Sequence, residues 1–85
     1  MKYMVRWLPA AEQELAALWL ASTKRAEVTR AAHLIDEVLK QTPEQTGESR
    51  SDDLRVHFEP PLAVLFRVSP DDLLVEVAHV WEYEP

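Results

Sequence analysis

Five polar residues in the second half of the sequence carry the side chains that acid–base cleavage of RNA would use. Arg55 and His57 are two positions apart, so both lie on one side of any strand that contains them. Arg67, His79 and Tyr83 follow on two later segments. On a shared open sheet face, the arginines would stabilise a phosphate while His79 or Tyr83 transfers a proton. A half-buried sheet needs polar residues on its solvent side in any case, and spacing alone favours that second interpretation.

The other reactive residue types form no recognised motif. The chain has no cysteine and one glycine, which excludes thiolate catalysis and a glycine-rich phosphate loop. His33 lies far in sequence from His57 and His79, and no carboxylate spacing completes a zinc site. Ser49 and Ser51 stand near acidic residues but outside a nucleophile elbow. We therefore expect no metal site and no cofactor.

Charge is divided unevenly along the chain. The net charge is −6, but residues 1–40 contain six basic and five acidic groups, whereas residues 41–85 contain three arginines against ten carboxylates. Affinity for nucleic acid comes largely from neutralising phosphates, and the acidic second half opposes it. This balance favours a protein partner, and a basic one in particular.

Hydrophobic periodicity predicts the elements that position these residues. Strand-like alternation covers residues 2–8 and ends at Pro9, and two helices follow over residues 10–21 and 25–41. Residues 42–53 are polar, contain the one glycine and predict a surface loop. Three more strands, over residues 54–59, 62–68 and 73–83, form a meander with short turns. The chain is therefore a single α+β domain over residues 1–85, in the order β-α-α-β-β-β, with an antiparallel sheet and a helical hairpin packed on one face.

The last strand has an ambiguous phase. Leu73, Val75 and Val77 have the spacing of buried residues, but Val80 has the character of a buried residue and Trp81 that of an exposed one. The two patterns differ by one residue, which indicates either a β-bulge or partial cover on both faces.

Apolar residues in two regions are candidates for binding a partner. Leu18, Trp19 and the alanine-rich helical segments offer more apolar surface than one small sheet covers, although packing on the sheet accounts for most of it. Trp81 and Tyr83 alternate with carboxylates at the end of the last strand, as expected for a sheet terminus that borders a partner-binding surface. We expect these four residues to contact a partner.

In pattern and length the chain resembles the RelE/ParE superfamily of toxins from bacterial type II toxin–antitoxin systems. The similar stretches span nearly the whole chain and are YMVRWLPAAEQELAALW, AAHLIDEVLKQTPEQTGESR, DLRVHFEPPLAVLFRV and VEVAHVW. The resemblance implies the β-α-α-β-β-β fold and a tightly bound antitoxin. It also implies one of two activities, since RelE-like members cleave messenger RNA on the ribosome and ParE-like members inhibit DNA gyrase.

The match to the RNA-cleaving branch is partial. That branch implies basic residues on the first strand of the meander, where Arg55 and His57 stand. It implies an arginine at the start of the next strand and another near the end of the last one, where this chain has Ala63 and Tyr83. Arg67 could replace one of these two missing cations.

We therefore expect a bacterial, cytoplasmic toxin of the plasmid-stabilisation type that acts in the ParE manner, by binding a protein such as DNA gyrase. Two alternatives stay open: a ribosome-dependent mRNA interferase that uses the five residues above, and a degenerate relative without toxicity. The expected partner is a cognate antitoxin, and both homo- and hetero-oligomers stay open. No apolar segment has the roughly 20 residues that a membrane span needs, and the first residues lack the pattern of an export signal.

Overall fold

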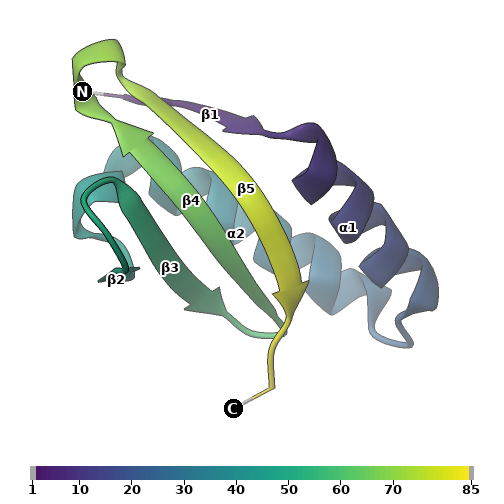
Figure 1. The fold of residues 1–85 in the computed structure, drawn as a ribbon. Helices are drawn as coiled ribbons and strands as arrows, with labels where there is room; N and C mark the ends of the chain where they lie inside the picture. Colours follow the sequence, from purple (N-terminus) through teal and green to yellow (C-terminus); the bar gives the residue numbers. More distant parts are fainter. Residues whose placement is uncertain (1, 85) are drawn as a thin grey trace.

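The segments with strand and helix periodicity form those elements in the computed structural model, which describes residues 2–84 (Figure 1). Their order is β1 (Met4–Trp7), α1 (Pro9–Ala21), α2 (Arg25–Gln41), the 3-10 turn η1 (Pro43–Gln45), β2 (Glu48–Ser49), β3 (Leu54–Glu59), β4 (Leu62–Ser69), the 3-10 turn η2 (Pro70–Asp72) and β5 (Leu74–Glu82). Both helices match the predicted ranges to within one residue at each end.

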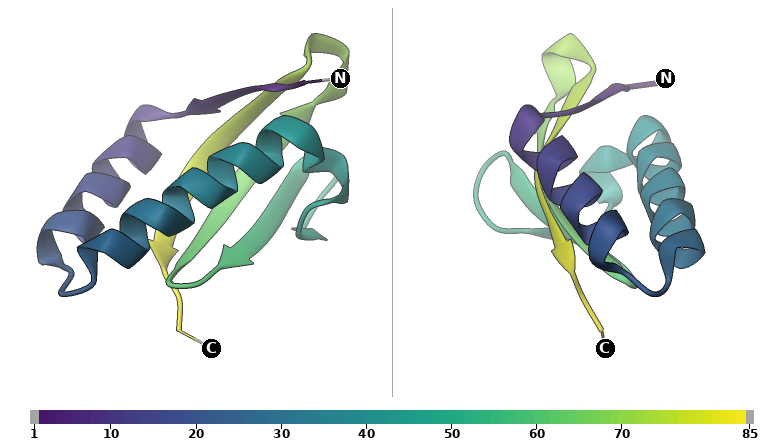
Figure 2. Two further views of the ribbon diagram at one scale, coloured as in Figure 1. Left: turned by 180° about the vertical axis from the view of Figure 1, so that it is seen from behind. Right: turned by 90° about the vertical axis from the view of Figure 1, so that its right-hand side faces the viewer.

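The two helices form a hairpin that covers one face of the sheet, as predicted (Figure 2). Pro9 occupies the first turn of α1, where its missing N–H removes no helix hydrogen bond. α1 packs along β5, whereas α2 packs across β1, β3 and β4. The buried residues of α2 recur at the helical period and are Val28, Ala31, Ile35 and Leu39.

The sheet is mixed, which corrects the prediction of an antiparallel sheet. Its strand order is β1-β5-β4-β3-β2, and strands β2 to β5 are antiparallel to their neighbours. β1 is parallel to β5 in a register that pairs Val5 with Val75. The cause is topological. The hairpin returns the chain to the starting end of β1, where Tyr3 N–H donates to Lys40 O, and the two reversals of the meander leave β5 running parallel to β3.

The segment predicted as a surface loop, residues 42–53, contributes the edge strand β2. Glu48 and Ser49 pair with Val56 and Arg55 of β3. Gly47 precedes them with φ of +71°, and a Cβ atom there would lie 2.1 Å from the Val56 carbonyl oxygen. Only glycine fits this conformation and this close approach, so the single glycine of the chain fixes where β2 meets β3.

The last strand contains a β-bulge, which was one of the two alternatives that the sequence left open. Phe66 of β4 pairs with Val77 and Leu65 pairs with His79, so Ala78 is the extra residue. The bulge restores the buried phase beyond it, and Val75, Val77 and Val80 are all buried as expected. Leu73 is the exception, because it is only half-buried and ends η2 in the left-handed region, with φ of 49°.

The core lies between the sheet and the helices. Directly paired residues on antiparallel strands project from the same face, so the register assigns each strand residue to the helix face or to the open face. The strand residues on the helix face that belong to the core are Leu62, Val64, Phe66, Val68, Val75, Val77 and Val80. Tyr3, Val5 and Trp7 of the first strand pack against this cluster.

Candidate functional site

The two candidate arginines lie on opposite faces of the sheet. Arg55 pairs with Phe66, a core residue, and therefore projects from the helix face. Arg67 pairs with Leu54 and projects from the open face. The hypothesis of one cationic patch that holds both arginines on the open face, which spacing alone did not favour, is therefore not supported by the register.

The two candidate histidines are separated in the same way. His57 pairs with Val64 and lies on the helix face, whereas His79 pairs with Leu65 and lies on the open face. His57 Nε2 lies 3.3 Å from Glu59 Oε1, on its own strand. Arg55 and His57 therefore share the helix face, and Arg67 and His79 share the open face, so the candidate residues do not all meet on one face.

Both arginines bind acceptors within the chain. Arg55 donates from Nε to the Thr46 carbonyl at 2.8 Å and from Nη2 to the Gly47 carbonyl at 3.0 Å. Arg67 Nε lies 2.8 Å from Asp53 Oδ2, in an ion pair whose two side chains are half exposed. Arg55 thereby holds the turn before β2, and Arg67 ties β4 to the residue that precedes β3.

His79 belongs to a contact that sequence reasoning missed. β1 pairs with β5 only as far as Val77, so the next stretch of β5 has no strand beside it on that edge. Glu14 of α1 covers this stretch, because its Oε1 accepts the Val80 N–H at 3.1 Å and its Oε2 lies 3.2 Å from His79 Nδ1. The carboxylate thus satisfies an edge amide and orients the imidazole.

The aromatic residues at the end of β5 form a cluster on the open face. Trp81 pairs with Ala63, and Ala63 pairs with Phe58, so all three project from this face. The Tyr83 ring lies 4.6 Å from the Phe58 ring, measured between centroids. Tyr83 N–H donates to the Pro61 carbonyl and extends the β4–β5 pairing by one residue. The segment is therefore a sheet terminus with exposed aromatic rings.

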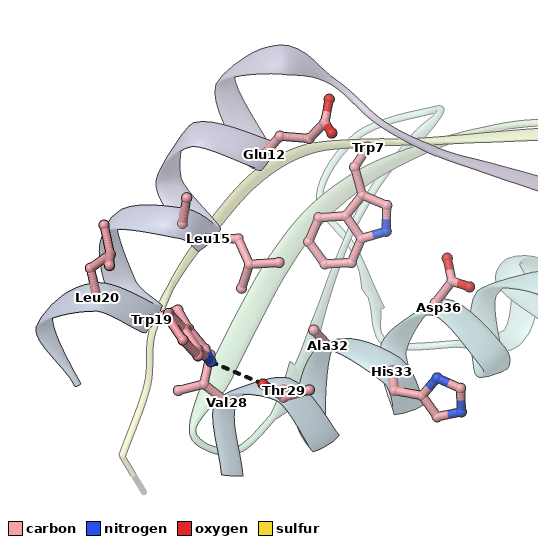
Figure 3. A pocket seen from close by; sticks show the side chains of 11 residues that line it. Trp7, Glu12, Leu15, Trp19, Leu20, Val28, Thr29, Ala32, His33 and Asp36 are labelled. Atoms are coloured by element: carbon pink, nitrogen blue, oxygen red, sulfur yellow. Dashed lines mark hydrogen bonds between the residues drawn. The ribbon is translucent and has the colours of Figure 1, made fainter. Parts of the chain in front are cut away.

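A groove opens between α1, α2 and the end of β1 on the other side of the sheet (Figure 3). Its volume is about 810 Å³, within the range of protein ligand sites. Its walls are largely apolar, and the lining residues are Trp7, Glu12, Leu15, Ala16, Trp19, Leu20, Val28, Thr29, Ala32, His33 and Asp36. No cation from Lys or Arg lines it.

Side-chain contacts of Trp19 and Arg25 connect the two helices at one end of the groove. Trp19 Nε1 donates to Thr29 Oγ1 at 3.1 Å, across the hairpin (Figure 3). Arg25 stacks over the Trp19 ring at 4.7 Å from its centroid and donates to the carbonyls of Trp19 and Leu20. These contacts satisfy carbonyls at the end of α1 and connect it to the start of α2.

The four residues predicted to contact a partner do not form one surface. Trp19 lines the groove, whereas Leu18 is half-buried and packs against the core. Trp81 and Tyr83 belong to the aromatic cluster on the open face. The groove residues that sequence reasoning missed include Trp7, Glu12 and Asp36, which lie on three different elements and share no sequence spacing.

Two further classes of site receive no support within residues 2–84. The described part of the chain contains no group of three or more His, Asp or Glu side chains placed to hold a metal ion. None of its helices combines the length and the hydrophobicity that crossing a bilayer requires.

Comparison with known proteins identifies the fold. No protein-family model and no curated protein matches the sequence. Among solved structures, the RelBE2 toxin–antitoxin complex from Mycobacterium tuberculosis is similar with a TM-score of 0.80 and 15% identity, over 96% of this chain and 92% of the matched chain. The chromosomal ParDE system from P. aeruginosa is similar with a TM-score of 0.69 and 18% identity, over 98% of each chain.

The isolated RelE toxin of E. coli is also similar, with a TM-score of 0.66 and 21% identity over 98% of this chain and 86% of that one. Structures of both the RelE and the ParE kind therefore match nearly the whole chain, at identities that establish a shared fold and no more. The sequence-based resemblance is confirmed at that level, and the chain has the fold of the RelE/ParE toxins.

Proposed function

We propose that the chain is the toxin component of a type II toxin–antitoxin pair, and that it acts by binding a protein target and not by cutting RNA. The observation that carries this proposal is the division of the candidate catalytic residues between the two faces of the sheet. Cleavage of RNA requires preorganised cations that converge on one developing phosphate charge. Arg55 and Arg67 cannot converge from opposite faces of one sheet.

The electrostatics support the same proposal. Arg55 and Arg67 are already bound to carbonyl and carboxylate oxygens of the chain itself. Residues 41–85, which contain strands β2 to β5, hold ten carboxylates against three arginines. Each carboxylate would repel a phosphate backbone, so binding to the ribosome and its message is disfavoured.

The groove between the helices is an argument for an antitoxin as the partner of this chain. The similar structures include complexes of RelE with RelB from E. coli and from Pyrococcus horikoshii. We propose that an antitoxin segment docks between α1 and α2 in this chain, where apolar side chains line a cavity large enough for several residues. The resemblance to ParE suggests DNA gyrase as the target of the free toxin.

Expression in a bacterial host tests the toxin assignment. Induction of this chain alone should arrest growth, and co-expression of the antitoxin from the adjacent gene should restore it. Hydrogen exchange on the purified pair should show protection along the groove-facing residues of α1 and α2. Growth without arrest would contradict the toxin assignment and favour a degenerate relative.

Purified protein tests the target class. DNA supercoiling by gyrase should be inhibited by the free chain and should recover when the antitoxin is added. If gyrase keeps its full activity while the chain still arrests growth, gyrase is rejected as the target and a different protein target is indicated.

A further inference from the structure

α1 lies at the surface, yet Glu12, Gln13 and Glu14 are its only polar residues and all of Leu15–Ala21 is apolar. Only Ala11 of its thirteen residues is buried, while the side chains of Trp19 and Leu20 are 40% and 65% exposed. A surface helix of a lone domain normally has a polar outer face. The apolar outer face of α1 is a wall of the groove, so a partner that fills the groove would cover it.

The groove has a different character at the end nearest β1. Its ionisable lining residues are Glu12, His33 and Asp36. In Figure 3 the Trp7 indole lies between the Glu12 carboxylate on α1 and the Asp36 carboxylate on α2. Lys40 Nζ pairs with Asp36 at 2.9 Å and with Glu37 at 3.5 Å, so the one ammonium group stands against three carboxylates when Glu12 is included.

We propose that Trp7, Glu12 and Asp36 form a subsite for an arginine or lysine side chain of a helical partner whose apolar residues fill the rest of the groove. This inference rests on the proposed function, because it specifies the chemistry of the segment that docks between the helices. It assigns the basic residue to the β1 end of the groove and the apolar residues to the end bounded by Trp19 and Leu20.

The subsite combines two attractions for a cation. The indole face of Trp7 attracts a guanidinium or ammonium group through its quadrupole. Glu12 and Asp36 add charge-assisted hydrogen bonds, for which a planar guanidinium is the best donor. An acidic side chain at the same place would meet the carboxylates of Glu12 and Asp36 with only the Lys40 ammonium beside Asp36 to offset them, so the subsite also selects against acidic partners.

A displayed library of helical peptides tests the inference on the full chain. The peptides have about 18 residues, or five helical turns, with leucine fixed along one face and Ala, Gln, Glu, Lys and Arg randomised elsewhere. Selection is run against the unmodified protein and against the double variant Glu12→Gln/Asp36→Asn. Counter-selection against Ala16→Gln, which places a neutral side chain in the groove, removes peptides that dock elsewhere.

The expected result is an excess of Arg and Lys over Glu at one end of the selected helices, which disappears in selection against Glu12→Gln/Asp36→Asn. A selected peptide, once synthesised, should bind this variant about tenfold more weakly than the unmodified protein. The matched control is Glu27→Gln/Glu37→Gln, which also removes two negative charges from the protein. Glu27 lies in the first turn of α2, and Glu37 is the second carboxylate that pairs with Lys40. This control variant should change the dissociation constant by less than about twofold.

Three other results would overturn the inference. Groove binders without a basic preference would reject the subsite but leave the docking groove. An equal loss of affinity in the control variant would show general attraction to an acidic protein. If no peptide binds in a way that depends on the groove, docking between the helices is rejected as well. The toxin assignment is tested separately, by whether expression of the chain arrests growth and the antitoxin restores it.

Discussion

The guanidinium of Arg55 donates a hydrogen bond to the carbonyl of Gly47, at 3.0 Å, and so holds the turn that leads into the edge strand β2. The sequence alone makes the same side chain a candidate for stabilising the scissile phosphate of an RNA substrate. Its Nε donor is also occupied, by the Thr46 carbonyl. Arg55 therefore has a structural role that its sequence position alone does not reveal.

Substitution of the two candidate arginines should separate structure from activity. Arg55→Ala should lower the free energy of unfolding by about 1–2 kcal/mol, because two charge-assisted hydrogen bonds are lost. Arg67→Ala should cost about 0–1 kcal/mol, because its ion pair with Asp53 is half exposed. Denaturant unfolding measures both. Growth arrest should persist in Arg67→Ala, whereas loss of arrest in this folded variant would restore Arg67 as a functional residue.

Gly47→Ala should destabilise the protein by about 1–3 kcal/mol, because the left-handed backbone strains any other residue. The new Cβ would also press on the Val56 carbonyl oxygen of β3. The measurement is denaturant unfolding followed by circular dichroism, with the exposed Gln45→Ala as the control in the same segment. Equal stability of the two variants would mean that β2 is not fixed by Gly47.

Glu14→Ala should expose the edge of β5 where β1 no longer covers it. The Val80 amide would lose its acceptor, so its hydrogen exchange should accelerate and the free energy of unfolding should fall by about 1 kcal/mol. Glu14→Gln keeps a carbonyl oxygen at this place and should have a smaller effect. Gln13→Ala, an exposed substitution on the same helix, should leave Val80 exchange unchanged. Unaltered exchange in Glu14→Ala would refute the edge contact.

The hydroxyl of Tyr3 donates a hydrogen bond to Glu44, and this bond, together with desolvation and the carboxylate charge, raises the pKa of Tyr3 above its ordinary value. A raised pKa in the folded state means that the contact stabilises fully below the unfolded pKa of about 10 and is lost as pH rises through the folded pKa. Stability should therefore fall above pH 10, and less so in Tyr3→Phe. Tyrosinate absorbance in a Tyr83→Phe background measures the shift directly, and an ordinary Tyr3 titration would contradict it.

Much of the fold could be predicted because local signals agreed with the final packing. Pro9 placed the start of α1, and the conflict of phase between Val77 and Val80 indicated the bulge at Ala78. β2 could not be predicted, because it is two exposed residues long and depends on Gly47 and Arg55. The parallel pairing of β1 depends on the path of the whole chain and has no local signal.

The site was less predictable because β4 is apolar in both phases. Leu62, Val64 and Phe66 face the helices, while Ala63 and Leu65 face the other way and are also largely covered. Periodicity alone could not decide which phase pairs with Arg55, so the face of each polar residue stayed undetermined. The groove was missed because its walls come from three elements.

Mapping of transcript 5′ ends in a bacterial culture, after induced expression of this chain alone, tests most directly whether the protein cuts RNA. We expect growth arrest without new ribosome-dependent cuts, because the candidate catalytic residues are divided between two faces of the sheet. Arrest with such cuts, abolished by Arg55→Ala/Arg67→Ala, would contradict this expectation and identify an RNase.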